Sequence, residues 1–87
     1  MKNRVKLYAN LGKYLPDGTA EGPTGNEADL EFDDGVTVGG VLEQLAVPRE
    51  HCHLVLVNGI FVPPGERDGW ALKEDDHLAV WPPVAGG

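Results

Sequence analysis

One stretch of this chain has the full spacing of an amphipathic helix, Leu11 and Leu15 could form one face of a short helical turn before Pro16, and most other apolar stretches alternate or run on continuously, as strands do. The helical stripe recurs at intervals of three and four residues, and it consists of Val38, Val41, Leu42 and Leu45. Thr37 is placed to cap the start of this helix, and Pro48 is expected to end it, because the residue before a proline avoids helical angles. Gly39 and Gly40 weaken the first turn, and we expect these small residues to let the helix lie close to a sheet.

Five segments are expected to form strands: residues 4–9, 28–32, 54–57, 60–62 and 77–81. The first two alternate polar and apolar side chains, as half-buried strands do. The third is wholly apolar, which predicts a strand buried on both faces or nearly so. The Asn58-Gly59 pair that follows it is the strongest short hairpin signal, because both residues tolerate a positive φ.

The order strand, strand, helix, strand, strand, strand predicts an α+β fold. One helix packed on one face of a mixed sheet of four to five strands is the economical way to bury these stripes, and it gives a roll of the β-grasp, or ubiquitin-like, kind. A chain of 87 residues is too short for two ordinary domains. We therefore expect residues 1–81 to form this domain and residues 82–87 to form a flexible tail that ends in Gly-Gly.

Two other segments could carry a function. Residues 16–27 hold three glycines, two prolines and no large apolar residue, so they predict a loop. This loop is either a partner-binding flap or an insertion at a surface tip, and we favour the insertion.

The second segment is the run from His51 through Cys52 to His53. A metal site needs further ligands, and His77 is the only other histidine, so no metal site is expected. We favour a buried Cys52 over a nucleophilic one, because nothing in the sequence argues for a lowered thiol pKa.

The composition limits the remaining functions. Seven Lys and Arg against 14 Asp and Glu give a net charge of −7, which disfavours nucleic acid as a partner. This balance either draws a basic protein partner or only keeps the domain soluble, and on charge alone we favour solubility. No serine and no glycine-rich phosphate loop are present, so enzymatic activity is not expected. No apolar run reaches the length of a membrane span or of a signal-peptide core, so we expect a cytoplasmic protein without a membrane partner.

The end of the chain carries the most specific motif. Residues 72–87 resemble the pattern Leu-x-x-Gly-Asp-x-Val-x-Ile-Phe-Pro-Pro-Val-x-Gly-Gly, with which the MoaD/ThiS family of ubiquitin-like sulfur carriers commonly ends. Asp75 stands where that family usually has Gly, and Asp can take the same left-handed conformation. Residues 5–9, 36–39 and 56–59 resemble the first strand, the helix start and the central hairpin of the family. The ending is closer to MoaD, the small subunit of molybdopterin synthase, than to ThiS.

The resemblance implies a carrier rather than an enzyme. In this family a ubiquitin-activating-type enzyme uses ATP to adenylate the C-terminal carboxylate, here that of Gly87, and a sulfur donor then converts it to a thiocarboxylate. The carrier itself binds no cofactor and no metal. The residues expected to contact the activating enzyme are Trp81, Pro82, Pro83, Val84, Ala85 and Gly86, with the apolar sheet face beside Trp81. For Trp81, simple packing in the core is an equal alternative.

The resemblance also implies a second partner, an acceptor enzyme of the molybdopterin synthase large subunit or thiazole synthase type. We favour molybdopterin or tungsten-pterin cofactor biosynthesis. The alternatives are a carrier for thiamine or cysteine biosynthesis and a modifier that becomes attached to lysines of other proteins. An acidic β-grasp interaction domain with an incidental glycine ending is the remaining alternative.

Overall fold

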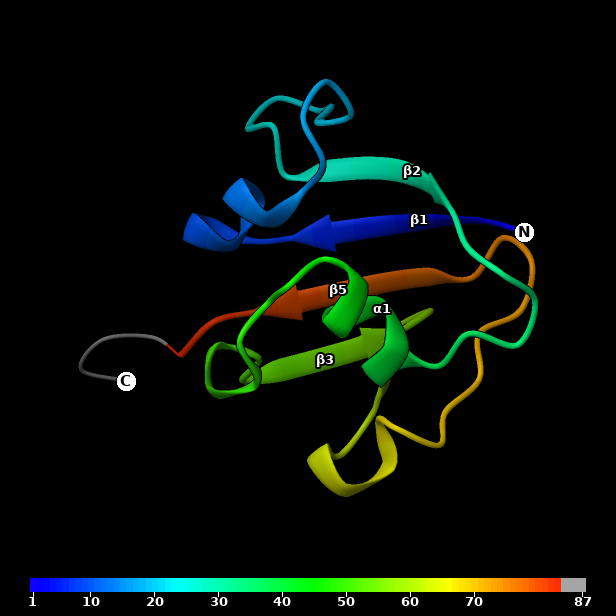
Figure 1. The fold of residues 1–87 in the computed structure, drawn as a ribbon. Helices are drawn as coiled ribbons and strands as arrows, with labels where there is room; N and C mark the ends of the chain where they lie inside the picture. Colours follow the sequence, from blue (N-terminus) through cyan, green and yellow to red (C-terminus); the bar gives the residue numbers. More distant parts are fainter. Residues whose placement is uncertain (84–87) are drawn as a thin grey trace.

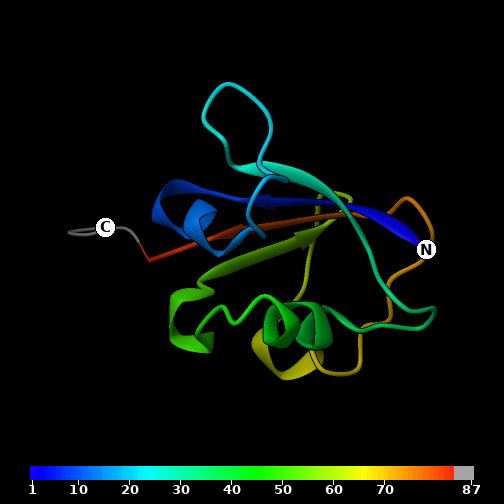
Figure 2. The ribbon, with the colours of Figure 1, turned by 45° about the horizontal axis from the view of Figure 1, so that its top comes forward.

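In the computed structural model, which describes residues 1–83, one mixed sheet carries a short helix on one face (Figures 1 and 2). The strands are β1 (Lys2–Leu7), β2 (Glu27–Glu31), β3 (Leu54–Val57), β4 (Ile60–Phe61) and β5 (His77–Trp81). Their order across the sheet is β2-β1-β5-β3-β4. The central strands β1 and β5 are parallel, and the other neighbours are antiparallel. The expected α+β roll of β-grasp type is confirmed, with five strands.

The core lies between the sheet and the helix α1 (Val38–Gln44). Strand side chains alternate between the two faces, so every second residue points toward the helix. The buried strand residues are Val5, Leu7, Ala28, Leu30, Val55, Val57, Leu78 and Val80. In β3 the expectation of two buried faces holds for one face only. Leu54 and Leu56 point away from the helix and are partly exposed, because no layer of the described chain covers that face.

The helix begins as the sequence predicts. The Thr37 side chain accepts a hydrogen bond of 3.0 Å from the Gly40 N–H and caps the helix. The small residue at position 39 does not serve contact with the sheet, which corrects our expectation. A Cβ on Gly39 would collide with the Asp68 carboxylate. The Gly39 N–H also donates a hydrogen bond of 2.9 Å to the Arg67 carbonyl. The segment between β4 and β5 is therefore the neighbour that requires glycine there.

The helix ends earlier than expected, and not because of Pro48. Ala46 has a φ of 59°, which is the left-handed conformation. The Ala46 and Val47 N–H groups donate back to the Glu43 and Leu42 carbonyls, each at 3.0 Å. This pair of bonds is a Schellman motif, and it stops the helix before the proline is reached.

Arg67 anchors the segment that returns from β4 to β5. Its guanidinium is buried and donates to the backbone carbonyls of Cys52 at 2.8 Å and of Val62 at 3.2 Å. Burial lowers its pKa below the usual arginine value. The sequence analysis did not identify this residue, since an arginine in a polar loop is normally exposed.

Loop 16–27 is tied down at its base. The Asn26 side chain is buried and donates to the Leu7 and Ala9 carbonyls. The backbones of Glu21 and Glu27 form an isolated bridge, which closes the loop beside β2. Most residues between the two are exposed. The insertion at a surface tip, favoured over a partner-binding flap, stays a prediction.

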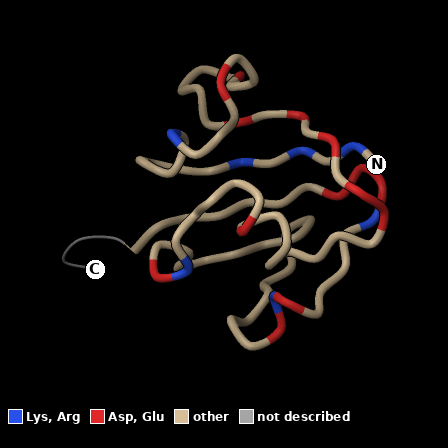
Figure 3. Tube along the Cα trace, viewed as in Figure 1, with Lys and Arg blue, Asp and Glu red and all other residues tan. Residues whose placement is uncertain are grey.

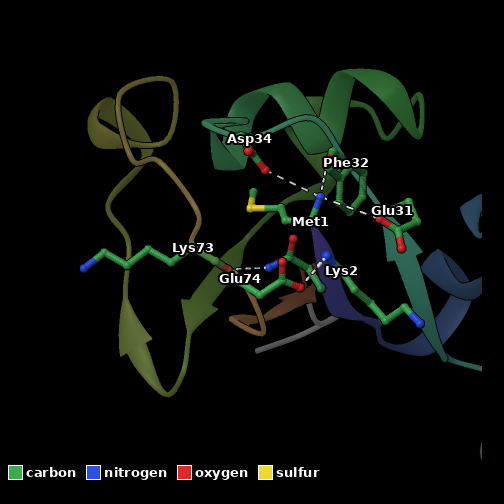
Figure 4. Close-up of polar contacts among 8 residues, drawn as sticks. Met1, Lys2, Glu31, Phe32, Asp34, Lys73 and Glu74 are labelled. Carbon is green, nitrogen blue, oxygen red and sulfur yellow. Dashed lines mark hydrogen bonds and ion pairs between the residues drawn. The ribbon is translucent and has the colours of Figure 1, made fainter.

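Side-chain and terminal contacts also close the other end of the sheet, where β1 begins (Figure 4). The Met1 ammonium donates to the Phe32 carbonyl at 2.7 Å, and the Lys2 N–H donates to the Glu74 carboxylate at 2.8 Å. The buried Asn3 amide donates to the Lys73 carbonyl at 2.8 Å. The loop before β5 is thereby joined to the start of β1.

Candidate docking face and C-terminal segment

The sheet face opposite α1, which we call the open face, has two unlike halves. The charged half is formed by β1 and β2, whose outward residues are Lys2, Arg4, Lys6, Glu27, Asp29 and Glu31. The uncharged half is formed by β5, β3 and β4, whose outward residues are His77, Ala79, Trp81, Leu54, Leu56 and Phe61. These three strands contain no Asp, Glu, Lys or Arg. Figure 3 shows the contrast between β1 and β2 on one side and β3 and β5 on the other.

Arg4 pairs with acids of the charged half, whereas Lys2 and Lys6 form no side-chain ion pair within residues 1–83. Arg4 lies 3.0 Å from the Glu27 carboxylate and 3.1 Å from that of Asp29, with Glu21 at 3.6 Å. Hydrogen bonds to Glu27 and Asp29 raise the pKa of the Arg4 guanidinium. Cross-strand pairs of opposite charge stabilise a sheet, so this half has a structural explanation.

No ion pairs of this kind stabilise the uncharged half, because β3, β4 and β5 contain no Asp, Glu, Lys or Arg. Register places Ala79 of β5 beside Leu56 of β3, and Leu56 beside Phe61 of β4, so the three side chains follow one row across the sheet. Phe61 is 50% exposed, and Ile60, on the other face of the same hairpin, is 59% exposed. They are the exposed large hydrophobic residues of the described chain, and only Phe61 belongs to the open face, where it lies beside Leu56.

Trp81 lies at the end of β5, where the chain leaves the sheet. Its ring stacks on Tyr8 with a centroid distance of 4.3 Å and an interplanar angle of 7°. Register places it beside Leu54 on the open face, outside the buried core. Packing in the core, the alternative considered for Trp81, is therefore wrong. Its role in docking stays a prediction.

The C-terminal segment starts from this corner of the sheet. Because β5 runs parallel to β1, the chain leaves the sheet at the end away from Met1 (Figure 1). Pro82 is half-buried and Pro83 is exposed. The expected partner contacts at Val84, Ala85 and Gly86, and the expected reactive carboxylate of Gly87, lie outside the described residues and stay predictions.

The hairpin and the turn before β5 have the predicted backbone. Asn58 and Gly59 have φ values of 51° and 83°, and Asp75 has a φ of 68°. The Asn58 side chain donates to the Asp76 carboxylate at 2.8 Å and accepts from the His77 N–H at 2.8 Å. The hairpin that presents Phe61 is thus fastened to the start of β5.

The His51-Cys52-His53 run provides no second site. Cys52 is buried, as expected, and burial raises its thiol pKa, although the charges of Arg67 and Arg49 oppose the shift. Within residues 1–83 no three His, Cys, Asp or Glu side chains gather as metal ligands would. That part of the chain also encloses no pocket and has no helix long and apolar enough to cross a membrane.

Sequence reasoning expected an apolar face beside Trp81 but did not identify Tyr8, Leu56 or Phe61 as its members. A signal was present, since residues 54–62 and 77–83 contain no Lys, Arg, Asp or Glu. Assigning these residues to one face, however, requires the order of the strands in the sheet. That order cannot be predicted from a local sequence pattern.

Comparison with known proteins gives a consistent result. The profile of the ThiS family matches residues 18–87. SAMP1 from Haloferax volcanii is 25% identical over 100% of both chains, with a TM-score of 0.67. The Haloferax volcanii HVO 2177 protein is 27% identical over 100% of this chain and 87% of its own, with a TM-score of 0.73. No curated protein sequence matches significantly.

A third solved structure supports the fold alone. The putative molybdopterin converting factor, subunit 1, from Pyrococcus furiosus is 20% identical over 95% of this chain and 98% of its own. Its TM-score is 0.65. Each of these proteins has the sheet and helix described above.

Proposed function

Because this chain belongs to the ThiS family of small ubiquitin-like carriers and modifiers, we propose that it is a sulfur carrier whose cargo is attached at Gly87. The observation that carries the proposal is the Pro-Pro-Val-Ala-Gly-Gly ending at residues 82–87, which follows directly from a strand of the uncharged half. The six residues could extend about 20 Å, at about 3.3 Å per residue. That length is enough to carry a carboxylate into the active site of a docked enzyme.

The chemistry explains the tail. A carboxylate is a poor electrophile, so its oxygen must first attack the α-phosphorus of ATP, which releases pyrophosphate and leaves an acyl-adenylate. A sulfide then attacks the acyl carbon, AMP leaves, and the product is a thiocarboxylate. Gly86 and Gly87 have no side chains, which suits a narrow channel, and Pro82 and Pro83 reduce the entropy lost on docking. The activating enzyme supplies the catalysis and the ATP site.

For the pathway, we propose molybdopterin or tungsten-pterin cofactor biosynthesis. The MoaD-like ending supports this choice, and the acceptor would be an enzyme of the molybdopterin synthase large subunit type. A thiazole synthase type of acceptor, or one in cysteine biosynthesis, would use the same terminal chemistry.

A second candidate function is the modification of other proteins, since the family of small ubiquitin-like proteins to which this chain belongs comprises carriers and modifiers. A further structural match, described as small archaeal modifier protein 1 of Haloferax volcanii, is 23% identical with a TM-score of 0.66 and shares the fold. In that function the activated Gly87 carboxylate would be transferred to a lysine amine instead of to sulfur.

Mass spectrometry tests the proposal. Incubation with the cognate activating enzyme, ATP and a sulfide source should add the mass that corresponds to replacing one oxygen by sulfur, and the gain should map to the last peptide. Deletion of Gly87 should abolish the gain without lowering the melting temperature. Thiolation of the truncated chain would contradict the proposal, and stable conjugates in a lysate would favour the modifier.

A further inference from the structure

We propose that Asn26, at the base of loop 16–27, is a positioning residue for the stacked pair of Tyr8 and Trp81, next to which the C-terminal segment starts. This inference rests on the proposed carrier function and deepens it, because it gives the loop a part in presenting that segment. The part is played by the base of the loop and not by its tip, so it differs from that of a partner-binding flap.

Three strand ends meet at this corner of the sheet (Figure 1). β1 ends at Leu7, β2 begins at Glu27 and β5 ends at Trp81, and these ends coincide because β1 is antiparallel to β2 and parallel to β5. One residue beyond the paired strands, the Leu7 N–H donates to the Asn26 carbonyl at 2.8 Å. The base of the loop is therefore bonded to the strand end that directly precedes Tyr8.

The Asn26 side chain holds the backbone on both sides of Tyr8. Its NH2 group donates to the Leu7 carbonyl and, at 3.0 Å, to the Ala9 carbonyl. A side-chain amide has two N–H donors, and these two bonds use both. Ala9 has a φ of 52°, a left-handed conformation that a residue with a Cβ adopts where its surroundings hold it. The Asn26 amide provides this hold and thereby fixes how the chain turns after β1.

The space for this amide depends on Gly12. A Cβ on Gly12 would lie 2.7 Å from the Asn26 Nδ2 atom, which is closer than van der Waals contact allows. The φ of Gly12 is not positive, so the need is for space and not for an unusual conformation. Asn26 itself is buried. The amide thus has a defined position, and a single methyl group at residue 12 is expected to displace it.

Tyr8 transmits this constraint to Trp81. The Tyr8 N–H donates to the Val80 carbonyl at 2.9 Å, and the Tyr8 carbonyl accepts from the Leu11 N–H at 3.0 Å. Its ring stacks on Trp81 with centroids 4.3 Å apart and planes within 7° of parallel. Such a stack depends on the distance and orientation of both rings, so a change in the backbone at Tyr8 alters it. Trp81 is the last residue of β5, and its orientation sets the surroundings in which the C-terminal segment begins.

The fluorescence of Trp81 tests the positioning without any partner. In a Trp70→Phe background, Trp81 is the only tryptophan. Asn26→Asp keeps the shape of the side chain but replaces the NH2 donor by an oxygen, which repels both carbonyls. We expect the emission of Trp81 to move to longer wavelength, because its ring becomes more hydrated when the stack loosens. The matched control is Asn10→Asp, the same substitution at an exposed residue of the same turn, and it should leave the emission unchanged.

Steady-state adenylation of the full chain by its activating enzyme tests the functional consequence. Asn26→Asp should raise the KM for the carrier about fivefold and leave kcat unchanged, whereas Asn10→Asp should change neither. In a Tyr8→Ala background, Asn26→Asp should leave the KM where Tyr8→Ala alone puts it, because Asn26 acts through Tyr8. A merely structural asparagine would lower the melting temperature in both backgrounds without moving the KM. Gly12→Ala should change emission and KM in the same direction by a smaller amount, and it provides the test if Asn26→Asp does not fold.

The outcomes separate the two proposals. If the unaltered chain is not adenylated, the carrier function is overturned, and the emission of Trp81 still decides whether Asn26 positions it. If adenylation is normal and Asn26→Asp has the emission and KM of Asn10→Asp, the inference alone is overturned. An equal rise of the KM in the Tyr8→Ala background would also overturn it, because Asn26 would then act by a route other than Tyr8.

Discussion

The two halves of the open face solve the same problem, an uncovered sheet surface, in opposite ways. On β1 and β2 the outward side chains are charged, and Arg4 binds two acids across the strand pair, so the surface is stable in water without a partner. On β3, β4 and β5 the outward side chains are apolar or small apart from His77, and Phe61 remains half exposed. Exposed apolar area is unfavourable in water. Covering the uncharged half with a partner surface would therefore lower the free energy.

The comparison also explains the position of the C-terminal segment. β5 is the strand at which the two halves meet, and the segment leaves from its end. A partner that docks on the uncharged half therefore lies next to the origin of the tail.

The largest expected effect comes from placing a charge on Phe61, the exposed large hydrophobic residue of the uncharged half. Phe61→Asp should raise the KM for activation about thirtyfold, the size of a binding hot spot of about 2 kcal/mol. Ile60→Asp is the matched control, because it places the same charge on the same hairpin but on the other face. Equal losses in both variants would show that the hairpin tip, and not the open face, is the contact.

The second effect concerns the turn that presents Phe61. Gly59 has a φ of 83°, and a Cβ there would meet nothing within 4 Å, so any penalty is conformational. Gly59→Val should lower the free energy of unfolding by about 1–2 kcal/mol, measured by denaturant titration. Gly65→Val is the control, since its surroundings are equally open and its φ is not positive. If Gly59→Val keeps the free energy of unfolding but is no longer activated, the turn contacts the activating enzyme and its role is not structural only.

The comparison shows which parts of this molecule local sequence can specify. The helix cap at Thr37 and the hairpin at Asn58-Gly59 were predictable, because each depends on a few neighbouring residues and on backbone preferences. The left-handed Asp75 was expected from the family resemblance, in which Gly is usual at this position. The α+β roll was predictable from the order of these signals and from the single helical stripe.

Most of the features that sequence did not yield depend on distant contacts, and one depends on an unusual residue in a local motif. The helix end is a Schellman motif with Ala46 where glycine is usual, so no local signal marked it. The requirement for Gly39 comes from Asp68, and the burial of Arg67 comes from carbonyls of Cys52 and Val62. The division of the open face likewise depends on which strands become neighbours.

The third effect concerns the aromatic pair at the corner where the chain leaves the uncharged half. Tyr8→Ala removes the ring that stacks on Trp81 and should lower the free energy of unfolding by about 1 kcal/mol. It should also raise the KM for activation, because Trp81 loses its fixed orientation. Tyr8→Phe keeps the stack and should behave as the unaltered chain in both measurements. If Tyr8→Ala leaves the KM for activation unchanged, the pair of Tyr8 and Trp81 is not part of the docking surface.

The smallest effect is expected in the charged half, and it tests whether that half is structural only. Arg4→Met removes the cation from three carboxylates at the sheet surface and should lower the free energy of unfolding by about 0.5–1 kcal/mol, because surface ion pairs are screened by water. Added salt should reduce this difference, since it screens both the lost attraction and the remaining repulsion among the acids. Lys2→Met, at a lysine of the same strand that forms no side-chain ion pair within residues 1–83, should leave stability unchanged. Both variants should keep the KM of the unaltered chain. A KM for Arg4→Met raised as far as that of Phe61→Asp would mean that the partner covers both halves, and the division of the face would then have no functional meaning.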